Sequence, residues 1–360
     1  MYIKSVKLNN FRNYLSQEIQ LNKGINIFFG DNAQGKTNIL ESIFLCAIGK
    51  SFRAKKEKEL IKMDEEKAIV EIEFEKIDRD GKIKIELTNK KDVFINGIKK
   101  NRVSEILGNI NIVMFSPDDI EILKSGPAKR RRFLNILISQ LRPQYVYYLN
   151  MYIKTIEQRN NYLRQIKELN NSTKEMLKIW DEKLAEYASY VFNYRNEFVE
   201  NIKNKITTIH RNITEEKEEI KIKYISDCLD KGKYIEELEK NWEQDILRGY
   251  TTKGVHRDDI YIYINGKQVN IYGSQGQNRT VILSLKLSEL EIIYDEIGEY
   301  PILLLDDFMS ELDSKRRENF LKSISNAQIL ITCTDEFTIG DKMCKTYLVN
   351  SGKVSNRLEK

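Results

Sequence analysis

The sequence predicts an α/β protein in which both ends of the chain build one mixed α/β domain and a helical segment is inserted between them. Glycine is absent from Pro127 to Lys231, and the only later proline in that span is Pro143, so helices can run there without interruption. On both sides, glycine recurs at short intervals and strand-length apolar runs appear. We therefore expect three ranges, namely an N-terminal part of the mixed domain (1–126), a helical arm (127–216) and a C-terminal part of the mixed domain (217–360).

Strands are expected in both flanking ranges. Alternating or apolar runs that end at turn residues are typical of strands, and Asp-Gly or Asn-Gly between two such runs is typical of a hairpin. The N-terminal candidates are Tyr2–Leu8, Ala68–Ile77 and Lys82–Leu87 around Asp80-Gly81, Val93–Ile95 before Asn96-Gly97, and Ile110–Phe115. The C-terminal candidates are Ile220–Tyr224, Asp259–Ile264 before Asn265-Gly266, Pro301–Leu305, Gln328–Thr332 and Tyr347–Val349 as a last edge strand, with a helix over Val281–Leu290.

The middle range predicts a long helical hairpin. Apolar residues recur every seven positions, at Leu149, Ile156 and Leu163 and again at Leu177, Leu184, Val191 and Phe198. The residues 170–173 separate the two segments, and Ser172 with Glu175 fits a capping box that opens the second one. Two interpretations stay open: an amphipathic helix pair packed on the core, or a short protruding arm of coiled-coil type.

Composition excludes several classes of protein. With 41% hydrophobic and 31% charged residues in 360, the chain is globular, and no apolar run reaches the length of a membrane span. The N-terminus lacks a secretory signal pattern, and the four cysteines show no metal-binding spacing, so we expect a cytoplasmic protein with reduced thiols and no membrane partner. The net charge of +5 is compatible with binding to an anion, but it does not demonstrate such binding.

The strongest local motif is Gly30-Asp31-Asn32-Ala33-Gln34-Gly35-Lys36-Thr37, which matches the P-loop pattern GxxxxGK[ST]. An apolar strand, Ile25–Phe29, precedes it and a helical stretch, 36–48, follows it. Glycines let successive backbone N–H groups turn toward phosphates, and the helix N-terminus adds positive potential. In such a loop Lys36 reaches the β- and γ-phosphates and Thr37 binds Mg²⁺. The plain alternative is a glycine turn between a strand and a helix.

A second motif supplies the carboxylates that such a site needs. Ile302–Leu305 predicts a buried parallel strand, and Asp306 follows at its carboxyl end, where ligands bind in open α/β sheets. Asp306 is the candidate to hold the metal. Asp307 is the candidate to orient or deprotonate the attacking water.

A third motif, Ser274-Gln275-Gly276-Gln277, precedes a helix and predicts a second anion-binding turn. One nucleotide does not obviously need two phosphate-binding turns about 240 residues apart in one subunit. Two subunits that share nucleotides across an interface would use both.

Together these motifs resemble the ATP-binding-cassette (ABC) ATPases of DNA repair and chromosome maintenance, and within that group the bacterial RecF family. The resemblance spans the chain. It also includes Leu8–Tyr14, Pro117, Gly126-Pro127, Arg130-Arg131, the stretch 254–259 and Ser310-Glu311-Leu312-Asp313 after the carboxylates.

The resemblance implies roles for individual residues. ATP would be bound by Gly30, Asp31, Asn32, Ala33, Gln34, Gly35, Lys36, Thr37, Asn38 and Arg12. Ser274, Gln275, Gly276 and Gln277 would form the signature, in which Ser274 and Gly276 contact the γ-phosphate of the partner subunit. Lys36 and Asp307 would be catalytic, and Thr37 and Asp306 would hold Mg²⁺. Two departures from the wider ABC pattern favour a slow switch: Asp307 stands where a glutamate is usual, and Thr334 stands where a switch histidine is usual.

The resemblance also implies a function. An ATP-dependent homodimer would clamp single- and double-stranded DNA at their junctions in replication, DNA damage repair and the SOS response. Slow, DNA-stimulated hydrolysis would release it, and RecO- and RecR-type mediators would be its partners near the nucleoid. The alternatives are a structural chromosome protein of the SMC type, which needs a much longer coiled coil, and an ABC transporter subunit.

Two further features stay ambiguous. The run Lys129-Arg130-Arg131-Arg132 can bind phosphate, or it can form a solvated first turn or pair with Asp118 and Asp119. His256 can contact nucleic acid or a partner, or it can order a loop.

Overall fold

The chain divides into two compact units. The computed structural model describes residues 1–169, 175–308, 320, 324, 326–334 and 344–356. The first unit contains Met1–Asp119 and Glu289–Lys360, and the second contains Ile120–Ser288. An α/β architecture built from both chain ends is thus confirmed.

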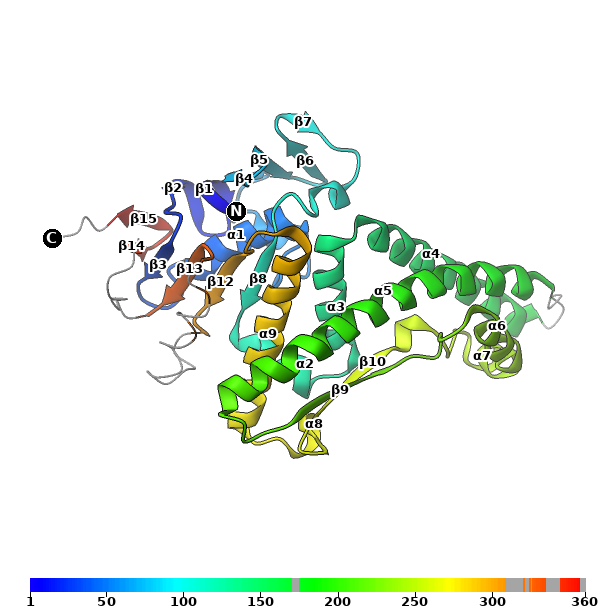
Figure 1. Cartoon of the computed structure of the whole chain (residues 1–360). Coiled ribbons are helices and arrows are strands. Elements are labelled where there is room, and N and C mark those ends of the chain that lie inside the picture. The colour runs from blue at the N-terminus through cyan, green and yellow to red at the C-terminus, as the bar shows by residue number, and fades with distance from the viewer. Residues whose placement is uncertain (170–174, 309–319, 321–323, 325, 335–343, 357–360) are drawn as a thin grey trace. The chain divides into compact units, whose positions relative to one another are not determined.

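The first unit contains a six-stranded, mainly parallel sheet in the order β15-β14-β3-β13-β12-β8 (Figure 1). Its strands are β3 (Ile25–Phe29), β8 (Ile112–Phe115), β12 (Ile302–Asp306), β13 (Ile329–Cys333), β14 (Cys344–Asn350) and β15 (Lys353–Asn356). All residues of β8 and β12 are buried, as expected for parallel strands covered on both faces. Tyr347–Val349 is not an edge strand: β14 pairs in parallel with β3, and β15 forms the edge. The Ser351-Gly352 turn, at φ 48° and 73°, lets the chain add this last strand.

A second, antiparallel sheet has the order β2-β1-β4-β5-β6-β7. Its strands are β1 (Tyr2–Phe11), β2 (Tyr14–Gln20), β4 (Ala68–Glu75), β5 (Asp80–Leu87), β6 (Lys91–Ile95) and β7 (Ile98–Lys99). Asn96 and Gly97 form the expected hairpin turn, both at positive φ. Asp80-Gly81 is not the turn of the other hairpin. These two residues pair with Glu75 and Phe74, so the turn falls at 76–79.

Helix α1 (Lys36–Ile48) contacts strands of both sheets, namely β4 and β5 on one side and β8, β12 and β13 on the other. This position explains why the helix is apolar nearly all round, with Ile39–Ala47 buried. Gly49 ends it in the left-handed conformation, φ 78°, and donates its N–H to the carbonyl of Leu45.

The second unit is mainly helical, with one small antiparallel sheet in the order β11-β10-β9. Its helices are α2 (Glu121–Lys124), α3 (Pro127–Leu141), α4 (Pro143–Leu169), α5 (Glu175–Thr214), α6 (Lys231–Lys240), α7 (Trp242–Arg248), α8 (Val269–Tyr272) and the first part of α9 (Gln275–Ile297). Its strands are β9 (Ile220–Ile225), β10 (Asp259–Ile264) and β11 (Lys267–Gln268). Short 3₁₀ helices lie at Glu57–Leu60, Val103–Ile106, Pro117–Ile120 and Val255–Arg257 along the chain.

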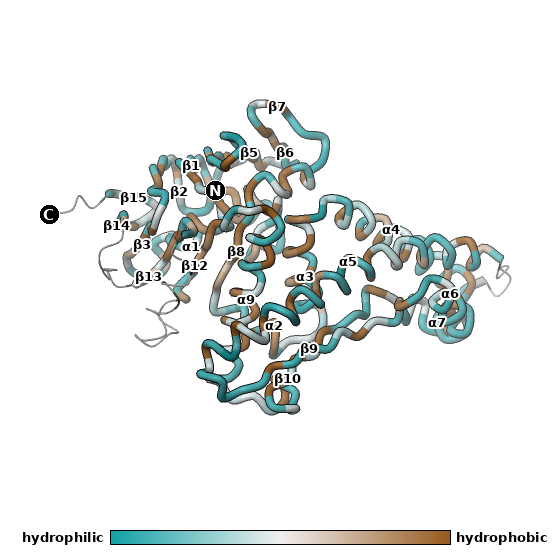
Figure 2. Tube along the Cα trace, in the orientation of Figure 1, coloured by the Kyte–Doolittle hydropathy of each residue, from teal (hydrophilic) through white to brown (hydrophobic). Residues whose placement is uncertain are grey.

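The predicted helical hairpin is confirmed as α4 and α5, while Ser172 of the proposed capping box lies outside the described residues. Leu177, Leu184, Val191 and Phe198 are fully buried. Both helices carry hydrophilic and hydrophobic stretches in Figure 2. Helix α5 also contacts α3, α6 and β9, which favours the packed helix pair over a free-standing arm.

The compact units differ from the predicted ranges. The sequence predicts residues 217–288 as part of the mixed domain, but they belong to the helical unit. The physical reason is that β9 packs on α5 and β10 packs on α3. The first boundary falls at Asp119 rather than at residue 126, because α2 packs on α3.

Two buried arginines hold the helical unit together. Arg159 of α4 lies 2.6 Å from Asp181 of α5 and 2.7 Å from Asp245 of α7, and all three side chains are fully buried. Arg195 of α5 lies 2.7 Å from Asp258, just before β10. A buried charge is tolerated only with hydrogen-bonded partners, so these pairs fix how the helices and the sheet meet.

His256 orders the loop before β10. Its Nδ1 lies 2.7 Å from the hydroxyl of Tyr152 on α4, and its Nε2 lies 3.2 Å from the carbonyl oxygen of Thr251. Burial lowers its pKa to about 4, so the ring is neutral at pH 7. This geometry favours the structural interpretation of His256.

Among the described helices, none has the length and apolar character to cross a membrane.

The buried neutral His256 predicts an acid-dependent loss of stability. An unfolded histidine binds a proton near pH 6.5, whereas folded His256 stays neutral until about pH 4. The stabilisation is therefore complete above pH 6.5 and decreases as the pH falls toward 4. We expect the difference in unfolding free energy between wild type and His256→Gln to shrink by about 2 kcal/mol between pH 7.5 and pH 5, measured by urea unfolding. An equal difference at both pH values would contradict a neutral His256.

Candidate nucleotide site

The P-loop connects β3 to α1 as expected from the strand–glycine–helix pattern. Gly30 and Gly35 have φ values of 148° and 115°, which side chains rarely allow. A Cβ on Gly30 would lie 2.3 Å from the carbonyl oxygen of Val349 on β14, and one on Gly35 would lie 2.6 Å from the Asn13 side chain. Both glycines are thus required by the backbone and by its neighbours. Asp31, Asn32 and Ala33 at the tip are exposed, with Ala33 at φ 66°.

Lys36 is folded back into the loop. Its side chain is largely buried, and Nζ donates to the carbonyl oxygens of Gly30 at 2.6 Å and Asp31 at 2.9 Å. These two carbonyls hold the ammonium group at the mouth of the loop. A phosphate oxygen can exchange with such carbonyls because it carries a full negative charge.

Thr37 and Asp306 meet at the carboxyl edge of the parallel sheet. The Thr37 hydroxyl donates to Oδ1 of Asp306 at 2.8 Å, and the Thr332 hydroxyl at the end of β13 donates to the same oxygen at 2.8 Å. Burial raises the pKa of Asp306, whereas the hydrogen bonds from Thr37 and Thr332 lower it. Hydroxyl and carboxylate oxygens are ligands that Mg²⁺ prefers, so this pair fits a magnesium ion held directly or through water.

Asp307 follows in the left-handed conformation, φ 48°, and its N–H donates to the Thr332 hydroxyl at 3.0 Å. Thr332 therefore contacts both Asp306, the last residue of β12, and Asp307, which follows that strand. Thr334, at the position of the switch histidine, is exposed just after β13. The expected motif Ser310–Asp313 lies outside the described residues.

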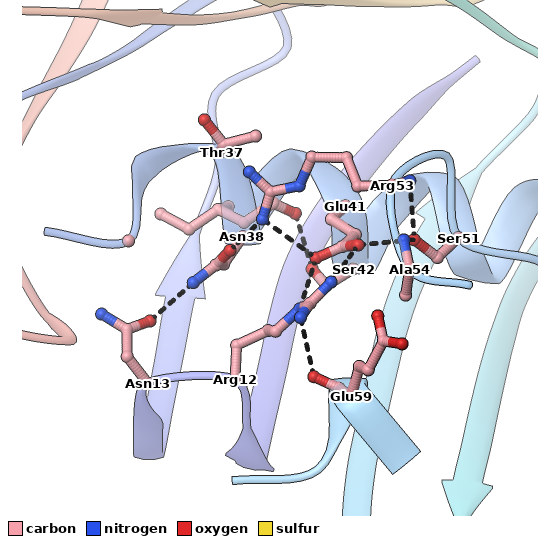
Figure 3. A network of polar contacts seen from close by, with 12 residues as sticks. Arg12, Asn13, Thr37, Asn38, Glu41, Ser42, Ser51, Arg53, Ala54 and Glu59 are labelled. Atoms are coloured by element: carbon pink, nitrogen blue, oxygen red, sulfur yellow. Dashed lines mark hydrogen bonds and ion pairs between the residues drawn. The ribbon is translucent and has the colours of Figure 1, made fainter. Parts of the chain in front are cut away.

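Asn13, in the turn between β1 and β2, supports the loop from below (Figure 3). Its Nδ2 donates to the carbonyl oxygen of Gln34 at 2.8 Å, and its Oδ1 accepts from Asn38 Nδ2 at 2.8 Å. The adjacent Tyr14 hydroxyl donates to the carbonyl oxygen of Gly35 at 3.0 Å. Asn38, expected to contact nucleotide, thus also anchors the loop.

Glu41 is the centre of a buried network on α1 (Figure 3). Its fully buried carboxylate forms a two-bonded pair with Arg12, Nε to Oε2 and Nη2 to Oε1, both at 2.8 Å. Ser51 donates to Oε1 at 2.5 Å, and Arg53 Nη2 lies 3.5 Å from Oε2 and 2.7 Å from Asn38 Oδ1. Arg12 also donates through Nη1 to the carbonyl oxygen of Glu59 at 2.7 Å. Arg12, expected to bind nucleotide, is therefore bonded within the chain by Nε, Nη1 and Nη2.

The turn Ser274–Gln277 opens α9 within the second unit. The Ser274 hydroxyl accepts from the N–H of Gln277 at 3.2 Å, and the Ser274 N–H donates to Gln277 Oε1 at 3.0 Å, which forms a capping box. Ser274, Gln275 and Gly276 are exposed. A Cβ on Gly276 would meet nothing within 4 Å, whereas one on Gly273 would lie 2.6 Å from the carbonyl oxygen of Val269. The fold thus requires Gly273, while Gly276 leaves the backbone open to a ligand.

The basic run on α3 is partly internal. Arg130 is buried and pairs with Asp259, with Nη2 to Oδ2 at 3.0 Å. Arg131 donates to the carbonyl oxygen of Asp258 at 2.7 Å, and Lys129 pairs with Glu121. These three residues thus bond to the carboxylate of Asp259, the carbonyl of Asp258 and the carboxylate of Glu121.

Sequence reasoning missed Glu41, Arg53, Asn13 and Thr332. Glu41 had a visible signal, because it is a lone charge in the apolar run Ile39–Leu45. Thr332 likewise interrupts an apolar strand. Asn13 and Arg53 carry no such signal, since their partners come from segments far along the chain.

Comparisons with known proteins agree with this geometry. Residues 2–355 match the protein-family model described as RecF/RecN/SMC N terminal domain. The "DNA replication and repair protein RecF" of Alkaliphilus oremlandii is 41% identical over 98% of this chain and 100% of its own length. The protein of the same name from Clostridium acetobutylicum is 44% identical over 98% of this chain and 97% of its own length.

Solved structures match as well. The recombination mediator RecF with ATP, from the RecFOR pathway, superposes with a TM-score of 0.94 at 38% identity, covering 99% of this chain and 98% of that chain. The Smc head domain of Pyrococcus furiosus gives a TM-score of 0.57 at 17% identity over 99% of this chain and 96% of that chain, which shows a shared ABC-type fold. The chain therefore belongs to the RecF/RecN/SMC N-terminal-domain family and, within it, to the RecF family of DNA replication and repair proteins.

Proposed function

We propose that this chain is an ATP-driven DNA clamp of recombinational repair and replication. The observation that carries the proposal is the contact of Thr37 with Asp306 at 2.8 Å, beside a P-loop that already holds Lys36 at its mouth. A hydroxyl and a carboxylate suited to Mg²⁺, together with an ammonium group suited to phosphate, fit a nucleoside triphosphate bound with Mg²⁺. The related RecF with ATP supports the choice of ATP.

Each residue has one part in the proposed reaction. Lys36 leaves the carbonyls of Gly30 and Asp31 and neutralises the β- and γ-phosphates. Thr37 and Asp306 would hold Mg²⁺, which would polarise the phosphates when bound. Asp307 accepts the proton of the attacking water. Because Asp is one methylene shorter than Glu, we infer a slow ATPase.

The exposed signature turn supports a dimer with shared nucleotides. Ser274 and Gly276 present a hydroxyl and an unobstructed backbone at the N-terminus of α9, which suits a phosphate oxygen. We infer that this turn meets the γ-phosphate bound by the partner subunit. ATP then joins two subunits, and hydrolysis separates them.

The proposed ligand and partners follow from the family. The DNA would be gripped by its phosphates, at junctions of single and double strands. The RecFOR pathway named for the related structure supports mediators of the RecO and RecR type as partners. Association with the nucleoid would follow from DNA as the ligand.

The two carboxylates separate binding from hydrolysis. Asp306→Asn should weaken binding of Mg²⁺ and ATP by about 10- to 100-fold, because a metal partner loses its charge. Asp307→Asn should bind ATP normally but hydrolyse it at least about 100-fold more slowly, because the base is gone. Equilibrium binding of a fluorescent ATP analogue and phosphate release measure the two effects. Equal losses of binding in both variants would contradict the division of roles.

The signature turn is tested by mass in solution. Ser274→Arg places a large cation where the γ-phosphate of the partner subunit must approach. We expect this variant to bind ATP as a monomer but to remain monomeric with ATP in light scattering, whereas Asp307→Asn accumulates as a dimer. If Ser274→Arg dimerises like the wild type, the turn does not act across subunits, and a monomeric P-loop enzyme is the better description.

DNA binding should depend on ATP and on salt. If the protein neutralises about six DNA phosphates, its affinity for DNA should fall about 1,000-fold between about 50 and 200 mM salt, because binding releases counterions. Lys36→Met should abolish the gain in DNA affinity that ATP gives the wild type, while its circular dichroism spectrum stays unchanged. Stimulation of ATP turnover by DNA would separate this function from that of a structural chromosome protein. A DNA affinity that is independent of both salt and ATP would overturn the proposal of an ATP-driven DNA clamp.

A further inference from the structure

The side chain of Gln277 is engaged from two sides. Its Oε1 accepts the N–H of Ser274 at 3.0 Å, as part of the capping box of α9. Its Nε2 donates to Oε1 of Glu218 at 2.8 Å. The carboxamide therefore points toward its own unit and not toward the exposed face formed by Ser274, Gln275 and Gly276.

Glu218 is in turn tied to the end of α5. Its Oε2 lies 3.2 Å from Nε2 of His210, a fully buried residue in the last turns of that helix. A carboxylate has no proton to donate, so Nε2 of His210 carries the proton. Nδ1 of His210 lies 2.9 Å from the hydroxyl of Ser284, further along α9. Helix α5 and helix α9 are thus linked at two points, Gln277 and Ser284.

This arrangement suits a positioning device better than a solvated surface. The side chain of Glu218 is only 20% exposed, and both of its oxygens have a partner in the same unit. A hydrogen bond to an ionised group is stronger and shorter than a neutral one, so the carboxylate fixes the orientation of the Gln277 carboxamide. The carboxamide then fixes the Ser274 N–H, and with it the turn that faces the ligand.

We propose that Glu218 and Gln277 are positioning residues that couple the C-terminal end of α5 to the signature turn. The proposal rests on the ATP-dependent dimer proposed above and deepens it. Gln277 is assigned to holding the turn, while Ser274 and Gly276 meet the phosphate. Any partner or DNA that shifts α5 then changes the affinity of the signature for nucleotide through Glu218.

The test exchanges the donor and the acceptor. Gln277→Glu keeps an oxygen for the Ser274 N–H but sets a second carboxylate against Glu218. We expect the ATP-dependent dimer of this variant to dissociate about tenfold more readily, with ATP affinity of the monomer unchanged. In the double variant Glu218→Gln with Gln277→Glu, the amide at position 218 donates to the carboxylate at position 277 and accepts from Nε2 of His210. The hydrogen bond between the two positions is thereby restored, with donor and acceptor exchanged. We expect it to dimerise within about twofold of the wild type.

A matched control neutralises the carboxylate of Glu219, the neighbour of Glu218. Glu219→Gln alters an exposed carboxylate that pairs only with Lys221 among the contacts described, and should dimerise like the wild type. The proposal is overturned if Gln277→Glu dimerises normally, or if the double variant is no better than the single one. If Gln277 had a merely structural role, Gln277→Glu would lower the thermal unfolding midpoint. The double variant would then not restore dimerisation selectively.

A second measurement separates this inference from the proposed function. Hydrogen exchange at the amides of 274–277 is measured without nucleotide, so it does not depend on dimerisation. We expect faster exchange in Gln277→Glu and wild-type rates in the double variant. Unchanged exchange in Gln277→Glu overturns the coupling even if ATP dimerises the protein. A wild type that exchanges as expected but never dimerises with ATP overturns the clamp instead.

Discussion

The hydrogen bond between Thr37 and Asp306 joins residues that are 269 positions apart in the chain. It exists because β3 and β12 both pair in parallel with β13, so that their carboxyl ends reach the same edge of the sheet. The hydroxyl of Thr332 on the intervening β13 bonds to the same oxygen of Asp306 and accepts the N–H of Asp307. The candidate nucleotide site is therefore a consequence of strand order: only when the two chain ends share one sheet do the P-loop and Asp306 meet.

Buried charges then fix the elements around that edge. Glu41 has no exposed side-chain surface, and its pair with Arg12 joins α1 to the turn between β1 and β2. Breaking a buried ion pair by removing one partner typically costs about 3–5 kcal/mol, because the other charge stays buried without compensation. Arg53 joins the same carboxylate and also Asn38, one residue after Thr37. The orientation of α1, and with it the position of Lys36 and Thr37, thus depends on ion pairs and hydrogen bonds within the chain.

The sequence was informative where the structure depends on local rules. The P-loop, the apolar strand before Asp306, the Asn96-Gly97 turn and the spacing of Leu177 and Leu184 each follow from residues close together in the chain. It was uninformative where pairing is distant. Nothing local to Tyr347–Val349 shows that β14 pairs with β3, and nothing in 217–288 shows that β9 and β10 pack on α5 and α3. For the same reason the pairing of Arg12 with Glu41, the lone charge in the apolar run Ile39–Leu45, could not be predicted from the sequence around either residue.

The signature turn shows how contacts within the chain distinguish the residues of a single motif. Ser274, Gln275, Gly276 and Gln277 all stand at a helix N-terminus, and the family resemblance already singles out Ser274 and Gly276 as the contacts to the γ-phosphate. Their contacts separate them, because the side chain of Gln277 already holds the Ser274 N–H and Glu218. A carboxamide that made both bonds could reach a phosphate only by giving up one of them, and Glu218 would then lose the partner of its Oε1. The cheaper arrangement leaves Gln277 in place and lets the hydroxyl of Ser274 and the backbone at Gly276 meet the phosphate. In that arrangement the strength of the proposed ATP-dependent dimer would depend on how well the end of α5 holds the side chain of Gln277 through Glu218.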